Sequence, residues 1–259
     1  MITAQSVSPD LHDAVVATED QRFYRHLGIS PRGIASAIRI NLSEGRGAFE
    51  GNGGSTITQQ TAKLLCLGVE WDPAKWTSEA DYERDCRQGG MWRKIKEVPF
   101  SLAMEVKYSK EEILTIYLNR AYLGAGARGF EAAAQRYFGK SAKDVTAAEA
   151  AMLAGLLKAP STFAPTASLE RAQGRAALVI GLMEEQGLLT KAEADAARAD
   201  PATLSKAAKQ DSGGYFADWV METTPDYLAS DTTEDVLIET TLDQDLQKKA
   251  EEALAWVFE

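Results

Sequence analysis

Two adjacent carboxylates, Glu19 and Asp20, follow a short apolar segment near the start of the chain, and His26 comes six residues after Asp20. Carboxylates at the C-terminal end of a helix cost about 0.3–1 kcal/mol each, because the helix dipole is negative there. Two of them together, beside a histidine, therefore indicate a site. A glutamate against an apolar wall has a raised pKa, which makes it a better general base. Taken alone, His26 is more typical of a structural hydrogen-bonding residue than of a catalyst.

The stretch 53–63 opens with two glycines and carries polar side chains at a spacing of four residues, which places them on one face of a helix. The free N–H groups at the start of such a helix, together with the positive end of its dipole, can hold an anion. A solvated helix with an ordinary cap is the alternative, and capping statistics alone favour it by about two to one. The residues on or beside this face are Ser55, Thr56, Gln59, Gln60 and Lys63.

A third stretch places Arg93 and Lys94 four and three residues before Glu97. The simpler interpretation is a surface ion pair, worth about 0.3–0.5 kcal/mol. The functional interpretation is a cluster of cations with one embedded carboxylate. Such a cluster could bind a diphosphate, and the carboxylate could orient a cation or ligate a metal ion.

The 259 residues carry a net charge of -10 and have an isoelectric point near 4.9, which disfavours non-specific binding of nucleic acid through a global positive field. Within that anionic chain, residues 87–110 hold six Lys or Arg against two acids, and a solvated helix face is the alternative to a binding surface. No run approaches the roughly 18 apolar residues that a membrane span needs, and the N-terminus lacks a signal-peptide pattern. We therefore expect the chain as it stands to be soluble.

The interval 69–90 is polar, and its aromatic residues show no periodicity, so we expect an irregular insertion there. The two cysteines of the chain, Cys66 and Cys86, fit no zinc motif, because no second Cys or His lies close to either. A disulfide in an oxidising compartment and two buried free thiols are both open interpretations.

The spacing of apolar residues and the helix caps predict a mainly helical chain up to about residue 200. Ser8–Pro9 is a helix start, and capping boxes begin at Ser109 and Thr146. After residue 200 only the stretch 236–241 is typical of a strand. The predicted helices cover residues 9–19, 33–42, 56–65, 92–107, 109–119, 146–157, 171–185, 191–198 and 244–256, with one more that ends near residue 138.

These stretches resemble, in the same order along the chain, the motifs of a known family: the peptidoglycan glycosyltransferase (transglycosylase) domain of class A penicillin-binding proteins. Five motifs in sequence are highly specific, and they cover about residues 10–165. The tail 240–247 looks like the approach to the family's penicillin-binding transpeptidase domain. The motif residues are Glu19-Asp20-x-x-Phe23-x-x-His26-x-Gly28, Gly53 to Lys63, Arg93-Lys94-x-x-Glu97, Lys110 to Asn119 and Arg128 to Lys140.

The resemblance implies a mainly α, lysozyme-like glycosyltransferase domain over residues 1–205, with a larger head lobe and a smaller jaw lobe that faces the membrane. Residues 206–259 would be a linker with a short α/β fragment, the start of a truncated transpeptidase-side module. The family's transpeptidase domain and N-terminal membrane anchor are absent, so we expect the chain to be trimmed from a longer protein. That protein would work at the periplasmic face of the bacterial inner membrane, with the membrane surface but no nucleic acid as a partner.

The reaction that the resemblance implies is polymerisation of lipid II. The 4-hydroxyl of an acceptor glycan attacks the anomeric carbon of a lipid-diphosphate-linked glycan, which inverts to a β-1,4 bond and releases undecaprenyl pyrophosphate. Glu19 would be the general base, and Glu97 the second acidic residue, which would orient cations or ligate Mg²⁺ or another divalent cation on the diphosphate. Moenomycin is a known inhibitor of the family. The residues expected to bind or organise lipid II and the growing glycan strand are Asp20, Phe23, His26, Ser55, Thr56, Gln59, Gln60, Lys63, Arg93, Lys94 and Asn119.

The chain departs from the family between Lys63 and Arg93, where the interval is longer than expected. Cys66 and Cys86 stand near the two ends of the extra residues, 68–90, so a disulfide that pins the insertion is a hypothesis. Some relatives use another cation of this interval for the leaving group, and Arg84 and Arg87 are both candidates.

Residues 29–52 correspond to the family's mobile, membrane-facing lobe. The apolar stripe Ile34, Ile38 and Leu42 could enter lipid, and ordinary core packing is the alternative.

Two other functions compete with glycan synthesis. A lysozyme-like hydrolase would need an acid and a second carboxylate flanking the sugar, and it would have no use for the helix 55–63 and the cluster 93–97. A non-catalytic module that only binds lipid II would not need Glu19 and Glu97, and both residues are present.

Overall fold

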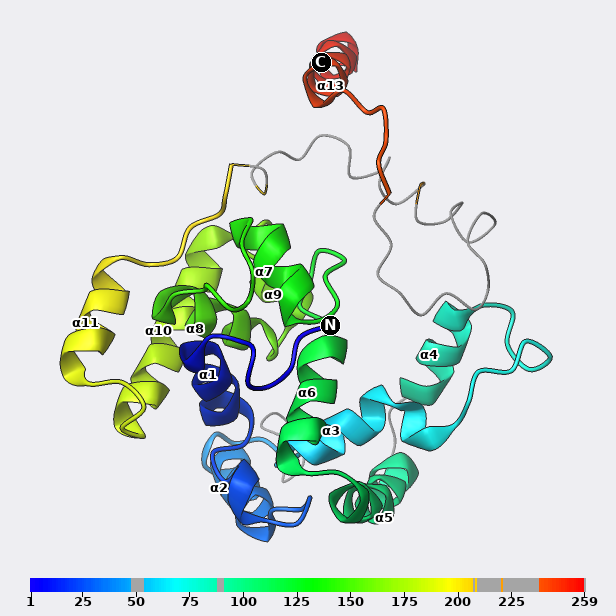
Figure 1. The fold of residues 1–259 in the computed structure, drawn as a ribbon, viewed down its shortest axis with the longest axis vertical. Coiled ribbons are helices and arrows are strands. Elements are labelled where there is room, and N and C mark those ends of the chain that lie inside the picture. Colours follow the sequence, from blue (N-terminus) through cyan, green and yellow to red (C-terminus); the bar gives the residue numbers. More distant parts are fainter. Residues whose placement is uncertain (48–53, 88–90, 207, 209–219, 221–237, 259) are drawn as a thin grey trace. The chain divides into compact units, whose positions relative to one another are not determined.

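The structure, a computed structural model of the 259-residue chain, describes residues 1–47, 54–87, 91–206, 208, 220 and 238–258. The side chains of a few helical residues, among them Arg93, lie outside that description. The chain divides into two compact units, unit 1 (residues 1–205) and unit 2 (residues 206–259). The predicted mainly helical fold is confirmed, and no β-sheet forms within the described residues (Figure 1). The division into head and jaw lobes stays a prediction.

Unit 1 is a set of α-helices joined by short loops and two 3-10 turns, η1 (Phe23–Arg25) and η2 (Cys66–Gly68). Its described helices are α1 (Pro9–Glu19), α2 (Pro31–Ser43), α3 (Ile57–Leu64), α4 (Glu79–Arg87), α5 (Met91–Lys107), α6 (Lys110–Arg120), α7 (Phe130–Phe138), α8 (Ala147–Leu156), α9 (Pro160–Phe163), α10 (Leu169–Glu185) and α11 (Lys191–Ala199).

Helix caps fix where the helices begin. Ser8 caps α1 with its side chain, and Pro9 takes the first helical position, as predicted. Capping boxes open α3, α6, α8 and α11. In α3 the hydroxyl of Thr56 accepts the Gln59 N–H, and the Gln59 side chain accepts the Thr56 N–H, both at 3.1 Å. Thr56 rather than Ser55 is therefore the N-cap of α3. Each such cap is worth about 1 kcal/mol.

The core of unit 1 is built around α8, of whose ten residues eight are buried. This confirms the helix predicted over residues 146–157. Helices α1 and α10 pack against α8, with Leu11 and Val15 from α1 and Val179 and Met183 from α10 in the core (Figure 1). Because this apolar face anchors α1, the last turn of α1 is held in place, and that turn ends at Glu19.

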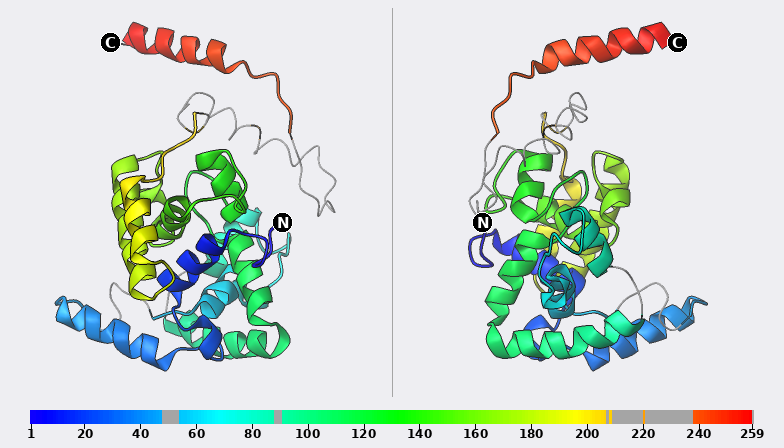
Figure 2. Two further views of the ribbon diagram at one scale, coloured as in Figure 1. Left: turned by 60° about the vertical axis from the view of Figure 1, so that its left-hand side comes forward. Right: turned by 90° about the vertical axis from the view of Figure 1, so that its right-hand side faces the viewer.

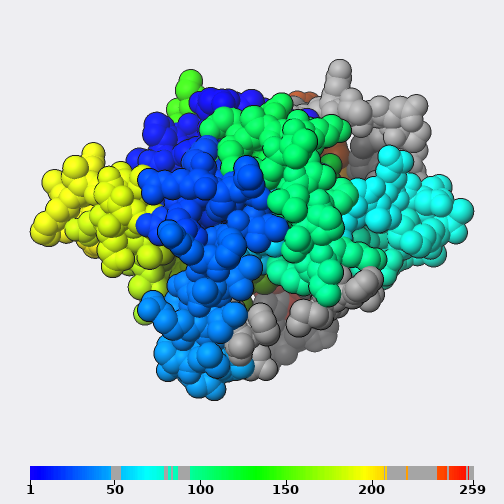
Figure 3. Space-filling model, turned by 90° about the horizontal axis from the view of Figure 1, so that it is seen from below, coloured from blue at the N-terminus to red at the C-terminus, as the bar shows by residue number. Residues whose placement is uncertain are grey.

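Helix α3 packs against α5 and α6, and its apolar side, including Ile57 and Ala62, is fully buried. The opposite, polar face of α3 is left facing the end of α1. Helices α2 and α5 lie at the same end of unit 1, below α3 in Figure 1 and in both views of Figure 2. Figure 3 shows that end face on, with α2 in blue and α5 in green.

The apolar stripe of α2 does not belong to the core. Ile34 and Leu42 are exposed, Ile38 is half-buried, and the buried residues of the helix are Ala37 and Asn41. Ordinary core packing of this stripe is therefore wrong, because α2 contacts the rest of unit 1 through a narrow face only.

The interval between α3 and α5 is more regular than predicted. The expected irregular insertion contains a nine-residue helix, α4, and a disulfide joins Cys66 to Cys86 with the Cα atoms 5.2 Å apart. The hypothesis of a disulfide is confirmed, and the open alternative of two free thiols is wrong. Helix α4 was missed because it is short and mostly polar, so its pattern lacks an apolar stripe.

In unit 2 the described helix is α13 (Gln244–Phe258), which confirms the predicted last helix. The predicted strand 236–241 is wrong over residues 238–241, which are irregular, while residues 236 and 237 lie outside the described part. An isolated strand has no partner with which to pair its backbone groups. Among the described helices, none has the length and the apolar run that crossing a bilayer requires.

Candidate active site

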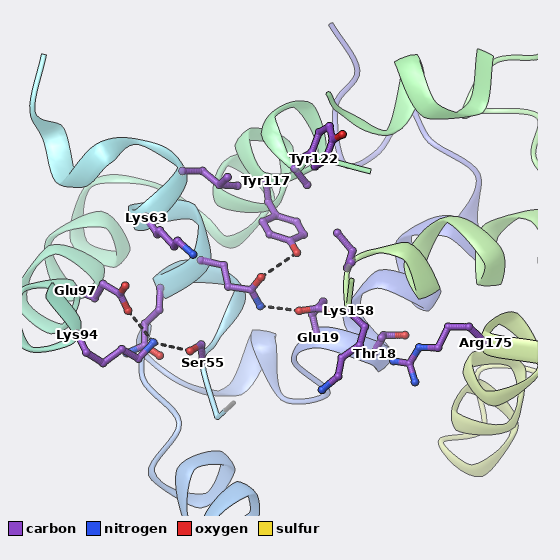
Figure 4. Close-up of a pocket in the computed structure, with 15 residues that line it drawn as sticks. Thr18, Glu19, Ser55, Lys63, Lys94, Glu97, Tyr117, Tyr122, Lys158 and Arg175 are labelled. Carbon is purple, nitrogen blue, oxygen red and sulfur yellow. Dashed lines mark hydrogen bonds and ion pairs between the residues drawn. The ribbon is translucent and has the colours of Figure 1, made fainter. Parts of the chain in front are cut away.

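The polar face of α3, the end of α1 and the loop after α8 surround a pocket of about 570 Å³, which we call the site pocket (Figure 4). Four cationic side chains and two carboxylates line it, in a chain whose net charge is -10. The described lining residues are Thr18, Glu19, Ser55, Gln59, Gln60, Lys63, Leu64, Lys94, Glu97, Tyr117, Ala121, Tyr122, Leu157, Lys158 and Arg175.

Glu19 is the carboxylate at the wall of this pocket, and a chain of two hydrogen bonds holds it. The amide Nε2 of Gln60 donates to Glu19 Oε2 at 2.7 Å, and the hydroxyl of Tyr117 donates to Gln60 Oε1 at 3.1 Å (Figure 4). Burial raises the pKa of Glu19, while the bond from Gln60 and the charges of Arg175 and Lys158 oppose the rise only in part. Such a carboxylate is a better proton acceptor than an exposed one.

The Tyr117 hydroxyl fixes which way the Gln60 amide points. Burial, and next the charge of Glu19, raise the pKa of Tyr117 well above its usual range, so its hydroxyl keeps the proton that it donates. That donor occupies the Gln60 oxygen and leaves the NH₂ group facing Glu19. A flipped amide would place its oxygen against the carboxylate, which is repulsive.

Asp20 has a structural role, because its hydrogen bonds join two helices. Its oxygens lie 2.9 and 3.0 Å from His26 Nε2, and Oδ2 accepts the Ile57 N–H at 3.1 Å. Ile57 is the first residue of α3, so a buried carboxylate stabilises the positive end of that helix dipole. Asp20 thereby joins the end of α1 to the start of α3, and His26 supports it.

The remaining residues of the first motif lie outside the site pocket. Phe23 is fully buried in the core, with Lys110 Nζ 4.5 Å from its ring centroid. Gly28 has φ +77°, and a Cβ there would come within 3.0 Å of the Ser101 carbonyl oxygen, so a side chain would be strained. The Gly28 carbonyl accepts the Thr56 hydroxyl at 2.6 Å, which ties this turn to the cap of α3.

Lys63 and Lys94 stand on the other side of the pocket from Lys158 and Arg175 (Figure 4). Lys94 Nζ lies 2.7 Å from Glu97 Oε2 and donates to Ser55 Oγ at 2.5 Å. The Glu97 side chain is only 2% exposed, whereas that of Lys94 is 44% exposed. Glu97 therefore orients an accessible cation. Arg93 is in the same helix, but its side chain lies outside the described part.

A second pocket, of about 540 Å³, adjoins the first on the side of α2, and Glu19 and Ser55 line both. Asp20, Thr56, Arg22 and Arg32 also line this α2-side pocket. Glu19 thus lies where two polar pockets meet. This is the arrangement that a transfer between two bound molecules requires.

Against the prediction, Asn119 lies outside both pockets. Its amide donates to the Ile2 carbonyl at 2.7 Å and accepts the Ile2 N–H at 3.1 Å, so it fixes the N-terminal segment against α6. It also donates to the Thr115 carbonyl at 2.8 Å. Both N–H groups of the amide and one lone pair of its oxygen are therefore used in contacts with the chain.

The described residues form no preformed metal site, because they contain no group of three or more His, Cys, Asp or Glu side chains that could hold a metal ion. Glu97 is already paired with Lys94. Mg²⁺ typically takes one or two carboxylates together with substrate phosphates, so a cation here would depend on a bound diphosphate for most of its ligands. The requirement for Mg²⁺ stays a prediction.

Sequence reasoning missed several lining residues, among them two tyrosines and two cations. Tyr117 lies in the predicted helix 109–119, and no pattern marks its hydroxyl. Lys158 comes from the loop after α8 and Arg175 from α10, far along the chain, and only the fold brings them to Glu19. Tyr122 follows α6 and lies between the fourth and fifth motifs, outside both.

Comparison with known proteins places the chain among cell-wall proteins. The family model described as Transglycosylase matches residues 1–184. Penicillin-binding protein 1A of Vibrio cholerae is 39% identical over 256 residues, 96% of this chain, and that of Escherichia coli is 35% identical over 256 residues, 98% of this chain. Each alignment covers 28% of the relative, so the chain spans little more than a quarter of these proteins. A crystal structure of penicillin-binding protein 1A from Haemophilus influenzae aligns with a TM-score of 0.40 and 38% identity, covering 47% of this chain and 18% of that one.

Proposed function

The chain belongs to the transglycosylase family, and from that premise we propose that it polymerises lipid II into the β-1,4-linked glycan strands of peptidoglycan. The observation that carries the proposal is the position of Glu19: a carboxylate with a raised pKa where two pockets meet, facing cations on both sides. One pocket would hold the donor glycan and the other the acceptor.

Glu19 takes the proton from the acceptor's 4-hydroxyl as that oxygen attacks the anomeric carbon of the donor. The bond from the anomeric carbon to the diphosphate breaks, the carbon inverts, and undecaprenyl pyrophosphate leaves. Gln60 and Tyr117 hold the Glu19 carboxylate in place for this transfer. General-base catalysis of this kind contributes typically 10²–10⁴-fold in rate.

Negative charge grows on the departing diphosphate, and the cations of the site pocket stabilise it. Lys94, oriented by Glu97, and Lys63 contribute from one side, with Ser55 as a neutral donor beside them. Mg²⁺ bound to the diphosphate would add to this stabilisation. Glu97 would then be the carboxylate that ligates it. Arg93 belongs to the same helix and would extend the cluster.

The full-length protein would act at the periplasmic face of the inner membrane, where lipid II presents its glycan. The exposed apolar residues of α2, Ile34 and Leu42, support contact of this end of unit 1 with lipid. A transpeptidase domain would follow in the part of the relatives that this chain does not span.

A lysozyme-like hydrolase is disfavoured by the charge of the pocket. A retaining or inverting glycosidase places two carboxylates around the sugar, whereas here the second carboxylate, Glu97, is buried and paired with Lys94. Four lining cations suit a phosphorylated substrate better than a neutral glycan.

Labelled lipid II and preformed glycan strands separate the two reactions. The proposal predicts that the chain elongates lipid II into longer strands, that moenomycin blocks this, and that preformed strands keep their length. Shortening of preformed strands, with no elongation of lipid II, would establish hydrolysis and overturn the proposal.

A further inference from the structure

The described part of the insertion between α3 and α5, up to residue 87, is held together by covalent and aromatic contacts. The Cys66–Cys86 disulfide closes it, and Trp71, Trp76 and Tyr82 pack on one another with ring centroids 5.0–6.2 Å apart. The indole N–H of Trp76 donates to Asp85 at 3.1 Å. Figure 3 shows the insertion, in cyan, at the edge of the face that α2 and α5 form.

The base of the insertion lies directly on α5. Three consecutive residues, Cys66, Leu67 and Gly68, have φ between 52° and 74°, which turns the chain sharply after α3. A Cβ on Gly68 would fall 2.7 Å from the Phe100 ring, so only glycine allows this approach. The insertion therefore leaves a groove along the side of α5 rather than an open loop.

This groove, the insertion groove, has a volume of about 580 Å³, within the range of ligand pockets. Leu64 lines both the insertion groove and the site pocket. Arg120 lines the groove, and the next residue, Ala121, lines the site pocket. The two hollows are therefore neighbours across the ends of α3 and α6.

The lining of the insertion groove combines aromatic faces with exposed cations. Trp71 and Tyr82 are half-buried, Phe100 lies beneath them, and Lys107 and Arg120 are exposed at the groove. Neither cation forms an ion pair with a carboxylate of the described residues, and the groove contains one acid, Glu70. The C–H face of a hexopyranose packs against aromatic rings, and free cations attract carboxylates.

We propose that the insertion groove binds the growing glycan strand: sugar rings stack on Trp71 and Tyr82, and the carboxylates of the stem peptides pair with Lys107 and Arg120. This inference rests on the proposed function, because it takes the product of that reaction as the ligand. A strand held there would stay bound between additions. The insertion would then set how many sugars are added before the strand leaves.

Binding of a purified strand fragment tests the proposal without requiring catalysis. The probe is an uncross-linked tetrasaccharide of alternating N-acetylglucosamine and N-acetylmuramic acid that carries stem peptides, titrated calorimetrically into the whole chain. We expect Trp71→Ala to weaken binding about three- to tenfold, because one stacking surface is lost. Trp256→Ala removes a tryptophan that is 80% exposed on α13, and it should leave the affinity unchanged.

Arg120→Gln is the second variant, and its side chain is exposed, so loss of the fold is not a concern. It should weaken binding of the peptide-bearing probe about two- to fivefold and reduce the salt dependence, but leave a neutral tetramer of N-acetylglucosamine unaffected. In polymerisation of lipid II, Trp71→Ala should give shorter strands than Trp256→Ala.

Equal affinity of the parent chain, Trp71→Ala and Arg120→Gln for the peptide-bearing probe would overturn the proposal, as would absence of binding to the parent chain. Failure of the proposed function gives a different pattern: lipid II is not elongated, whatever the probe binds. A chain that elongates lipid II but shows none of the expected losses keeps the proposed function and loses the strand-binding groove.

Discussion

Glu19 is surrounded by neighbours that act on its pKa in opposite directions. Burial and the nearby Asp20 raise the pKa, whereas Gln60, Arg175 and Lys158 lower it, and burial prevails. The residue is therefore a stronger base than an exposed glutamate, and it still ionises because the cations compensate for part of the burial. Two consequences can be measured on single residues.

Removing the Tyr117 hydroxyl should lower the fraction of Glu19 that is ionised, and so able to accept a proton, at neutral pH. In Tyr117→Phe the Gln60 amide loses the donor that fixes its direction, so its bond to ionised Glu19 weakens and the pKa of Glu19 rises further. We expect kcat near neutral pH to fall about three- to tenfold, since one hydrogen bond is worth about 1 kcal/mol. The acid limb of the kcat–pH profile should move to higher pH. Tyr137→Phe removes another buried hydroxyl, which donates to the Leu123 carbonyl, and should leave that limb in place.

An acid limb that stays where it is in Tyr117→Phe would show that the amide keeps its direction without the tyrosine.

The burial of ionised Glu19 should lower the stability of the folded state at neutral pH. A carboxyl whose pKa is raised on folding binds more protons in the folded state, so stability falls as pH rises from its ordinary value near 4.5 through the raised pKa. Glu19→Gln removes this loss, and at pH 7 it should raise Tm by about 2–4 °C. Thermal unfolding followed by circular dichroism provides the measurement.

Glu112→Gln is the control of opposite sign. Hydrogen bonds from the Ser109 backbone and side chain lower the pKa of Glu112, so its ionised form stabilises the fold above its ordinary pKa. This variant should lower Tm at pH 7. A Glu19→Gln variant that melts below the parent chain would mean that the carboxylate stabilises its surroundings.

At the scale of elements, the site depends on how the start of α3 lies against the end of α1, and Asp20 joins the two. Asp20→Ala leaves the Ile57 N–H and His26 without their buried acceptor, so we expect a loss of about 1–3 kcal/mol in the free energy of unfolding. The start of α3 also moves, and with it Gln60, so kcat should fall about ten- to hundredfold. Urea unfolding and lipid II turnover measure the two effects.

Asp20→Asn keeps an oxygen that can accept the Ile57 N–H. It should recover most of the stability and part of the rate. If Asp20→Ala were as stable and active as the parent chain, Asp20 would have no part in placing α3.

The elements themselves were largely predictable, because their signals are local. Ser8–Pro9, the capping boxes at Ser109 and Thr146 and the apolar spacing of α8 all mark features that depend on neighbours in the sequence. Helix α4 was missed because its stability comes from a disulfide and aromatic packing rather than from an apolar stripe. Asn119 was misplaced because its partner is the backbone of Ile2, a contact across 117 residues.

At the scale of the whole molecule, a chain of net charge -10 places four cations around one pocket. The negative charge of the whole chain and the positive charge around the pocket predict opposite responses to salt. If the global charge governed binding of the anionic substrate, screening would lower the KM for lipid II; if the pocket cations govern it, screening should raise the KM.

We expect KM to rise about two- to fivefold between 0.05 and 0.5 M salt, because the Debye length falls from about 14 to about 4 Å over this range. Turnover measured in neutral detergent over this range provides the check. A KM that falls with salt would assign control to the global charge. Sequence composition alone could not reveal this difference, because Lys158 and Arg175 join the pocket only through the fold.

The rate at which Glu19→Gln consumes labelled lipid II tests the central claim most directly. Glutamine keeps the size of the side chain but cannot accept the proton, so the account predicts a rate lower by at least about 100-fold, with the affinity for lipid II within about twofold of the parent chain. Polymerisation by Glu19→Gln at the parent rate would contradict it.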